Sequence, residues 1–127
     1  MINFEYLSDE NIFHVIRTGS ISVSELLDYQ QRMHERCKDM DAVYILDDSR
    51  KATTPFTYNE DITPLTEGLV EKLKTYRKVS HAIIMNNPHD AVITNLYKIL
   101  VDDFPNYNLK IFSTERAALQ WLKIEQI

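Results

Sequence analysis

The sequence predicts one α/β domain spanning residues 1–127, with elements in the order β-β-α-β-α-β-α-β-α and a mostly parallel sheet. The first observation behind this prediction is that short, continuously apolar runs alternate with longer stretches whose apolar residues recur at helical spacing. The second is that the apolar runs lack polar alternation, which is typical of parallel strands covered on both faces. Strands joined by helical crossovers must run parallel, so the alternation also sets the sheet type.

The first half of the chain is predicted to open with a hairpin, because strand-like runs at 2–7 and 12–17 flank turn-forming residues. Gly19 ends the second strand. Ser22 and Glu25 have the spacing of a capping box, so a helix starts there and runs to about residue 40. Its apolar face contains Leu26, Met33, Cys37 and Met40. The next strand covers 43–46 and stops at the polar residues that follow.

In the second half of the chain, predicted helices and strands continue to alternate. A long connection covers 50–62, and Thr63 with Pro64 starts the second helix. Strands are predicted at 82–85 and 109–112, separated by a helix from residue 88 to about 104. Ser113 or Thr114 caps a final helix.

Charge and cysteine content restrict the class of protein. The chain has 14 basic and 19 acidic side chains, a formal charge of -5. Because such a surface repels phosphate backbones and anionic lipids, we expect neither nucleic acid nor a membrane as partner. The single Cys37 cannot form an internal disulfide, and no export segment is evident. A cytoplasmic location is therefore expected.

Three stretches together resemble a known family. They are the passage through Gly19 and Ser22 into a capped helix, the apolar strand leading to Asp48, and a last strand followed by the helix that ends in Trp121-Leu122. This succession resembles STAS-type domains and, more closely, the SpoIIAA-like family of free-standing bacterial proteins of unassigned function. The resemblance spans nearly the whole chain and implies a SpoIIAA-like fold.

The same resemblance implies a kind of function. STAS domains that antagonise anti-sigma factors bind proteins and are switched by phosphorylation of a serine in an Asp-Ser-Ser-Gly-like motif before the second helix. This chain lacks that motif, and Thr57 and Thr63 are the hydroxyl residues in the corresponding region. The resemblance thus leaves a phosphosite at Thr57 or Thr63 open. Other relatives of the fold bind lipids or small apolar ligands.

Two adjacent carboxylates, Asp47 and Asp48, follow the strand at 43–46. Such a pair could bind Mg²⁺ or accept a phosphoryl group. Neighbouring strand residues point to opposite faces, however, so the two would not converge on one ion. We interpret both as residues that end the strand and satisfy turn amides, and we predict no metal site.

Polar residues also follow the later strands. Ligands favour the carboxyl ends of parallel strands, where helix N-termini offer free N–H groups. We therefore expect a ligand or partner site that includes Asp48, Asn86, His89 and Ser113. The alternative is that Asn87, Ser113 and Thr114 are ordinary helix caps and that His89 is a surface residue.

The sequence carries no signature of catalysis. The four histidines lack zinc-ligand spacing, and Cys37 falls in an apolar helix stripe, where burial raises the pKa of a thiol. With two glycines, the chain cannot form a glycine-rich phosphate loop or a nucleophile elbow. We expect no catalytic residue and no cofactor.

Two features favour binding. The long connection brings Arg50 together with Phe56 and Tyr58, a mixture suited to a protein or small-ligand contact. The helix at 88–104 is apolar beyond one stripe, and its surplus includes Tyr97, Val101 and Phe104. This surplus could be covered by a second copy of the chain, by the chain's own loop or by a partner.

These observations predict a non-catalytic binding or regulatory module that acts through protein–protein contact. The alternative is a small-molecule or lipid carrier with a pocket under residues 49–62. A third hypothesis is an uncharacterised enzyme.

Overall fold

The computed structural model describes residues 1–53, 67–69, 71–101 and 105–127, with the backbone alone at 93, 96, 97 and 99–101. Residues 67–69 and 71–73 are helical. The strands are β1 (Ile2–Leu7), β2 (Ile12–Ser20), β3 (Ala42–Thr53), β4 (Lys78–Ile84) and β5 (Tyr107–Phe112). The helices with complete bounds are α1 (Val23–Cys37), α3 (Pro88–Val101) and α4 (Glu115–Glu125), and each is too short or too polar to span a bilayer.

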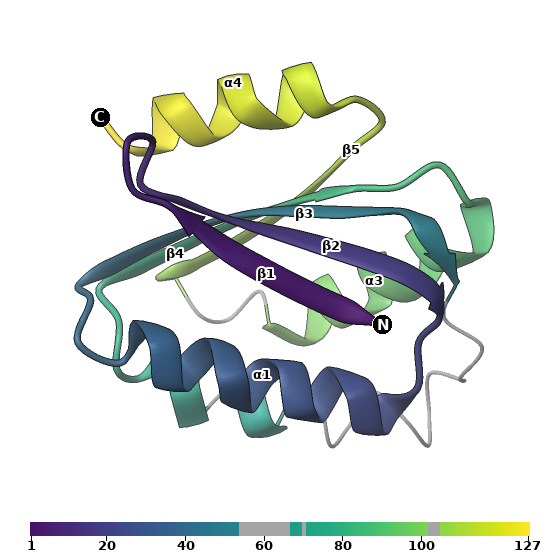
Figure 1. Cartoon of the computed structure of the whole chain (residues 1–127), viewed down its shortest axis with the longest axis horizontal. Helices are drawn as coiled ribbons and strands as arrows, with labels where there is room; N and C mark the ends of the chain where they lie inside the picture. The colour runs from purple at the N-terminus through teal and green to yellow at the C-terminus, as the bar shows by residue number, and fades with distance from the viewer. Residues whose placement is uncertain (54–66, 70, 102–104) are drawn as a thin grey trace.

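The five strands form one sheet in the order β1-β2-β3-β4-β5. β1 is antiparallel to β2, and the pairs from β2 to β5 are parallel, which confirms the predicted mixed α/β class with a mostly parallel sheet. Because the order is sequential and crossovers are right-handed, each helix that joins two parallel strands lies on the same face. Figure 1 shows α1 and α3 below the sheet and α4 above it. α4 can take the opposite face because it follows the last strand.

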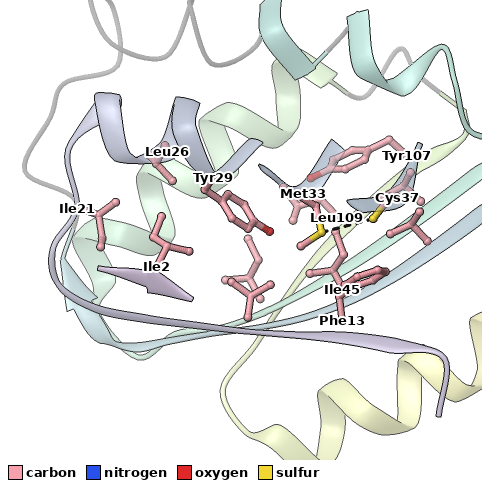
Figure 2. Packing of buried hydrophobic residues seen from close by; sticks show 14 of the residues in the cluster. Ile2, Phe13, Ile21, Leu26, Tyr29, Met33, Cys37, Ile45, Tyr107 and Leu109 are labelled. Atoms are coloured by element: carbon pink, nitrogen blue, oxygen red, sulfur yellow. Dashed lines mark hydrogen bonds between the residues drawn. The ribbon is translucent and has the colours of Figure 1, made fainter. Parts of the chain in front are cut away.

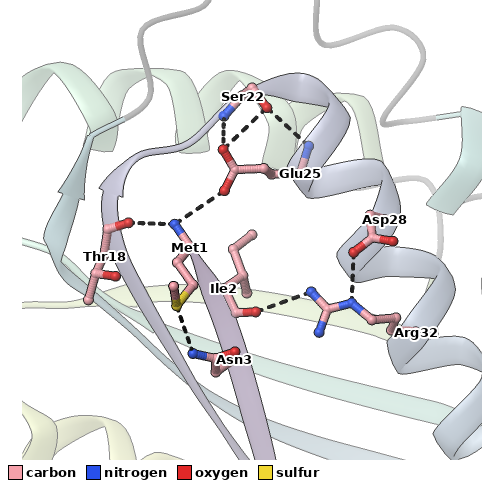
Figure 3. Close-up of polar contacts among 8 residues, drawn as sticks. All are labelled: Met1, Ile2, Asn3, Thr18, Ser22, Glu25, Asp28 and Arg32. Atoms are coloured by element: carbon pink, nitrogen blue, oxygen red, sulfur yellow. Dashed lines mark hydrogen bonds and ion pairs between the residues drawn. The ribbon is translucent and has the colours of Figure 1, made fainter.

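The start of α1 has the predicted capping box. The Ser22 hydroxyl accepts from the Glu25 backbone N–H at 3.1 Å, and the Glu25 carboxylate accepts from the Ser22 backbone N–H at 3.4 Å. Figure 3 shows that the same carboxylate also pairs with the Met1 ammonium, 3.2 Å away. The Met1 ammonium donates in turn to the carbonyl of Thr18. The entry to α1 is thereby joined to the open ends of the β1–β2 hairpin.

The core lies on both faces of the sheet. Below it, the apolar face of α1 packs against the strands, with Leu26, Met33 and Cys37 buried as predicted and Tyr29 buried beside them (Figure 2). Above it, Ala118 and Leu122 of α4 pack on a smaller cluster formed by Ile12, Tyr44, Leu46, Ala82 and Ile84. The lower cluster contains most of the buried apolar side chains, so α1 secures the sheet and α4 covers only part of its other face.

The predicted strand ends were wrong in four places, the first being β2, which continues to Ser20 rather than to residue 17. β3 continues to Thr53 instead of stopping after residue 46, β4 starts at Lys78 rather than 82, and β5 starts at Tyr107 rather than 109. In β3 and β4 the missed residues include buried polar ones, Asp47 and His81, whose side chains have hydrogen-bond partners. Polar residues can lie inside a strand when tertiary partners satisfy them. The interpretation of Asp47 and Asp48 as the end of the strand is therefore wrong.

The extended part of β3 contains an irregularity. Ile16 of β2 pairs with Asp48, whereas Thr18 pairs with Lys51, so β3 has one extra residue opposite Arg17. This is a β-bulge, which re-aims the side chains that follow it. Ala52 is consequently buried on the α1 side, the same side as Asp47.

Candidate functional site

The upper face of the sheet is only partly covered. α4 contacts β3, β4 and β5. On the same face, strand alternation and register place Asn3, Glu5, His14, Ile16, Asp48 and Arg50, a surface that we call the open face. Ile16 is 44% exposed, although it lies in the middle of a strand. Figure 1 shows that β1 and β2 lie beside the region over which α4 packs.

Asp48 and Arg50 form a bidentate ion pair on the open face. Arg50 Nε donates to Asp48 Oδ1 at 2.9 Å, and Arg50 Nη2 donates to Asp48 Oδ2 at 2.7 Å. The hydrogen bonds from Arg50 hold the pKa of Asp48 below its ordinary value. Asp48 pairs directly with Ile16 across the two strands, so a fixed charge pair lies next to an exposed apolar side chain.

Asp47 points to the opposite face, as strand alternation predicts for neighbours. Its carboxylate Oδ2 accepts from Arg17 Nη2 at 2.6 Å and from His81 Nε2 at 2.9 Å, and Oδ1 accepts from the Ser49 hydroxyl at 3.0 Å. The other ring nitrogen of His81 lies 2.9 Å from the Tyr107 hydroxyl. One residue from each of β2, β3, β4 and β5 thus joins a buried row that we call the polar chain, Arg17–Asp47–His81–Tyr107.

The polar chain is stabilised by charge despite its burial. Burial alone would raise the pKa of Asp47, but the positive charge of Arg17 and the hydrogen bonds from His81 and Ser49 lower it to about 2. Burial likewise opposes the charge of Arg17, and Asp47 outweighs this effect, so the pKa of Arg17 is raised. The guanidinium also lies over the Tyr29 ring, 5.4 Å from its centroid. Asp47 and Arg17 are therefore both ionised inside the core.

The predicted residues at the strand ends divide into two groups. Asn87 and Thr114 are helix caps, since their side chains accept from the backbone N–H groups of His89 and Ala117. Asn86, His89 and Ser113 are exposed, and no hydrogen bond among the described residues joins them to Asp48. A shared site at these positions remains a prediction. Asp48 and Arg50 are the members of the predicted set that the structure places side by side.

Several predicted residues lie outside the described part of the chain. They are Phe56, Thr57, Tyr58, Thr63 and Phe104, together with the side chains of Tyr97 and Val101 on α3. The predicted contact through Phe56 and Tyr58, the phosphosite and the homodimer surface therefore remain predictions.

Among the other histidines and the cysteine, His34 and Cys37 have local partners. His14 lies within β2, and His34 Nδ1 is 3.0 Å from the Tyr76 hydroxyl. Burial raises the pKa of the Cys37 thiol to about 12. Within residues 1–53, 67–69, 71–101 and 105–127, no cluster of three His, Cys, Asp or Glu side chains is placed to hold a metal ion.

The sequence reading missed Arg17, His81 and Tyr107. His81 lies inside the buried strand β4 but was placed before the predicted strand at 82–85, and Arg17 was placed at the end of the second strand. A signal for them exists in the sequence, because the neighbouring strands β3, β4 and β5 each carry a hydrogen-bonding side chain, Asp47, His81 and Tyr107, in an otherwise buried run. A buried charge requires a partner, so these polar side chains could have been paired with one another.

Comparison with known proteins bears on the fold. The chain matches no family model and no curated protein in sequence. A solved structure does match: an uncharacterised protein of the DUF3478 family with a SpoIIAA-like fold, from Shewanella loihica PV-4. The similarity covers 96% of this chain and 92% of that one, with a TM-score of 0.63 and 18% sequence identity. The fold is SpoIIAA-like. The resemblance inferred from the sequence is confirmed at this level, and the open face is a surface of a SpoIIAA-like sheet.

Proposed function

We propose that this SpoIIAA-like domain is a non-catalytic binding module that acts through protein–protein contact, and that the open face is its contact surface. The observation that carries the proposal is the uncovered part of the sheet around Ile16, with the Asp48–Arg50 ion pair beside it. An apolar centre with a polar, charged rim is the usual anatomy of a protein interface.

Rigidity supports this choice of surface. Ile16 and Asp48 are paired residues of two adjacent strands, and the whole open face is built on hydrogen-bonded sheet. Contact residues held by a sheet lose little conformational entropy when a partner binds, so less of the interaction free energy is spent on ordering them.

Charge indicates the chemistry of the partner. Glu5 and Asp48 lie on the open face, and Arg50 is already paired with Asp48. The whole chain carries a charge of -5. A partner that places an apolar side chain over Ile16 and basic side chains around it would complement this surface.

The absence of catalysis is also part of the proposal. Two reactive groups of the described chain support it, because both are engaged in the core. Cys37 donates to the Met33 sulfur and its pKa is raised to about 12, while His81 is bonded at both ring nitrogens. We also propose a cytoplasmic location, which suits a free buried thiol.

The carrier alternative needs an apolar pocket under residues 49–62, of which 54–62 lie outside the described chain. The described residues Ser49 and Ala52 line a cavity of about 30 Å³. Ligand sites for small organic molecules are about 300–1,000 Å³, so this cavity by itself is too small to hold such a ligand.

The test is a matched pair of substitutions. Ile16→Asp places a charge at the centre of the open face, whereas Ile124→Asp places one on α4 at a side chain that is 65% exposed. Each protein would be used to isolate partners from its own cells, and any partner would then be purified and titrated. We expect a basic protein that binds the parent and Ile124→Asp equally, and Ile16→Asp at least tenfold more weakly.

Three results would count against the proposal. The first is a partner that both variants bind as the parent does. The second is a small molecule that native mass spectrometry finds bound to the isolated protein and that Ile16→Asp retains. The third is turnover of any substrate that depends on a described side chain.

A further inference from the structure

A small cavity lies at the carboxyl ends of β3 and β4, on the α1 side of the sheet. Its volume is about 30 Å³, and its polar lining residues are Arg17, Ser49, Asp90 and Thr94. Apolar side chains, among them Ala52 and Met85, also line it. The cavity therefore adjoins the Arg17 end of the polar chain and the first turn of α3, to which Asp90 belongs.

One N–H group of Arg17 has no acceptor in the part of the chain that the structure describes. Its Nη2 donates to Asp47, but its Nε is buried and has no acceptor among the described residues. A buried N–H without an acceptor is unfavourable, because it has lost its hydrogen bonds to water, so an acceptor is expected near it.

The lining has the donor and acceptor pattern of a site for a neutral molecule. Ser49 donates its hydroxyl proton to Asp47 and so offers the cavity only lone pairs. The carboxylate of Asp90, which is 4% exposed, is also an acceptor. An anion would be repelled by the carboxylate of Asp90, and a cation has no lone pair to accept from Arg17 Nε. A ligand that both accepts and donates hydrogen bonds can pair with all three residues, Arg17, Ser49 and Asp90.

We propose that this cavity binds one water molecule, which accepts from Arg17 and donates to Ser49 and Asp90. The cavity is large enough, because a buried water needs about 10–15 Å³ and two to four polar partners. The water extends the polar chain from β5 through Arg17 to the first turn of α3. The sheet and α3 are then joined by a continuous row of hydrogen bonds.

A crystal structure of the unaltered protein, at a resolution that shows ordered waters, tests the proposal directly. We expect one well-ordered water within hydrogen-bonding distance of at least two of the residues Arg17, Ser49 and Asp90. An empty cavity, a bound ion or a larger molecule at this position would overturn the proposal.

Two variants of Ala52, which lines the cavity, provide a second test. Ala52→Ser and Ala52→Cys add side chains of similar size, and both displace the water. The serine hydroxyl can replace the water as a partner for Arg17, whereas a thiol is a weak acceptor. We expect Ala52→Ser to keep the melting temperature of the parent within about 2 °C and Ala52→Cys to lower it by roughly 5 °C. Equal melting temperatures for the two variants would contradict the proposal.

Discussion

The carboxylate of Asp47 lies 2.6 Å from the guanidinium of Arg17 inside the core, and the Asp47 side chain has no exposed surface. Its neighbour Asp48 points to the other face and pairs with Arg50 at the surface. The two adjacent aspartates differ in burial because neighbouring residues of a strand point to opposite faces of the sheet. This contrast makes them a matched pair for measuring what the polar chain contributes to stability.

Asp47→Asn should destabilise the fold by about 3 kcal/mol, because it leaves the charge of Arg17 buried without a counter-charge. Asp48→Asn should cost at most about 1 kcal/mol, since its ion pair is partly exposed to solvent. Urea denaturation, followed by circular dichroism, gives the free energy of unfolding of each variant. Similar costs for the two substitutions would show that the polar chain adds little stability.

Acid should weaken the fold through Asp47. Its pKa is about 2 in the folded chain, against an ordinary value of 3.8, so folding favours the ionised form. The resulting stabilisation, on the order of 2 kcal/mol, is complete well above pH 3.8 and is lost as the pH falls toward 2. The measurement is the free energy of unfolding between pH 6 and pH 2 for the parent and Asp47→Asn. The gap between the two should narrow as the pH falls, and parallel curves would rule out this role for Asp47.

Two tyrosine–histidine contacts differ mainly in burial. Tyr107 bonds to His81 in the core, and Tyr76 bonds to His34 in a partly exposed position. Tyr107→Phe should cost about 1–2 kcal/mol, because water cannot replace the lost hydroxyl at the buried ring nitrogen. Tyr76→Phe should cost about half as much or less, because water can replace the lost hydroxyl at this partly exposed position. Chemical denaturation of both variants is the measurement, and a larger loss for Tyr76→Phe would contradict the expectation.

Cys37 should be unreactive in the folded protein. Burial raises the pKa of its thiol from 9.0 to about 12, which lowers the thiolate fraction at pH 8 by roughly a thousandfold. A chromogenic disulfide reagent should label the unfolded chain within seconds and the native chain on the timescale of unfolding. Labelling of the native protein as fast as of the denatured one would show that the thiol is accessible.

The sequence by itself determined the α/β class, the order of the elements and the starts of α1, α3 and α4. Local signals are sufficient for these features: Ser22 and Glu25 cap a helix whatever lies around them, and apolar runs of strand length mark the sheet. The resemblance to SpoIIAA-like proteins followed from the same succession. Asp48 was also identified as a candidate, at a predicted strand end, and Arg50 as part of the predicted connection, although both lie within β3.

Only the tertiary structure decided how far the strands extend and where the candidate surface lies. Asp47 and His81 belong to strands because partners on neighbouring strands satisfy them, and a partner 30 or more residues away along the chain leaves no local pattern. The open face exists because the crossover helices lie on one side of a sequentially ordered sheet and α4 covers only part of the other. Ile16 is exposed for that reason alone, since its β-branched side chain in a strand reads as core in the sequence.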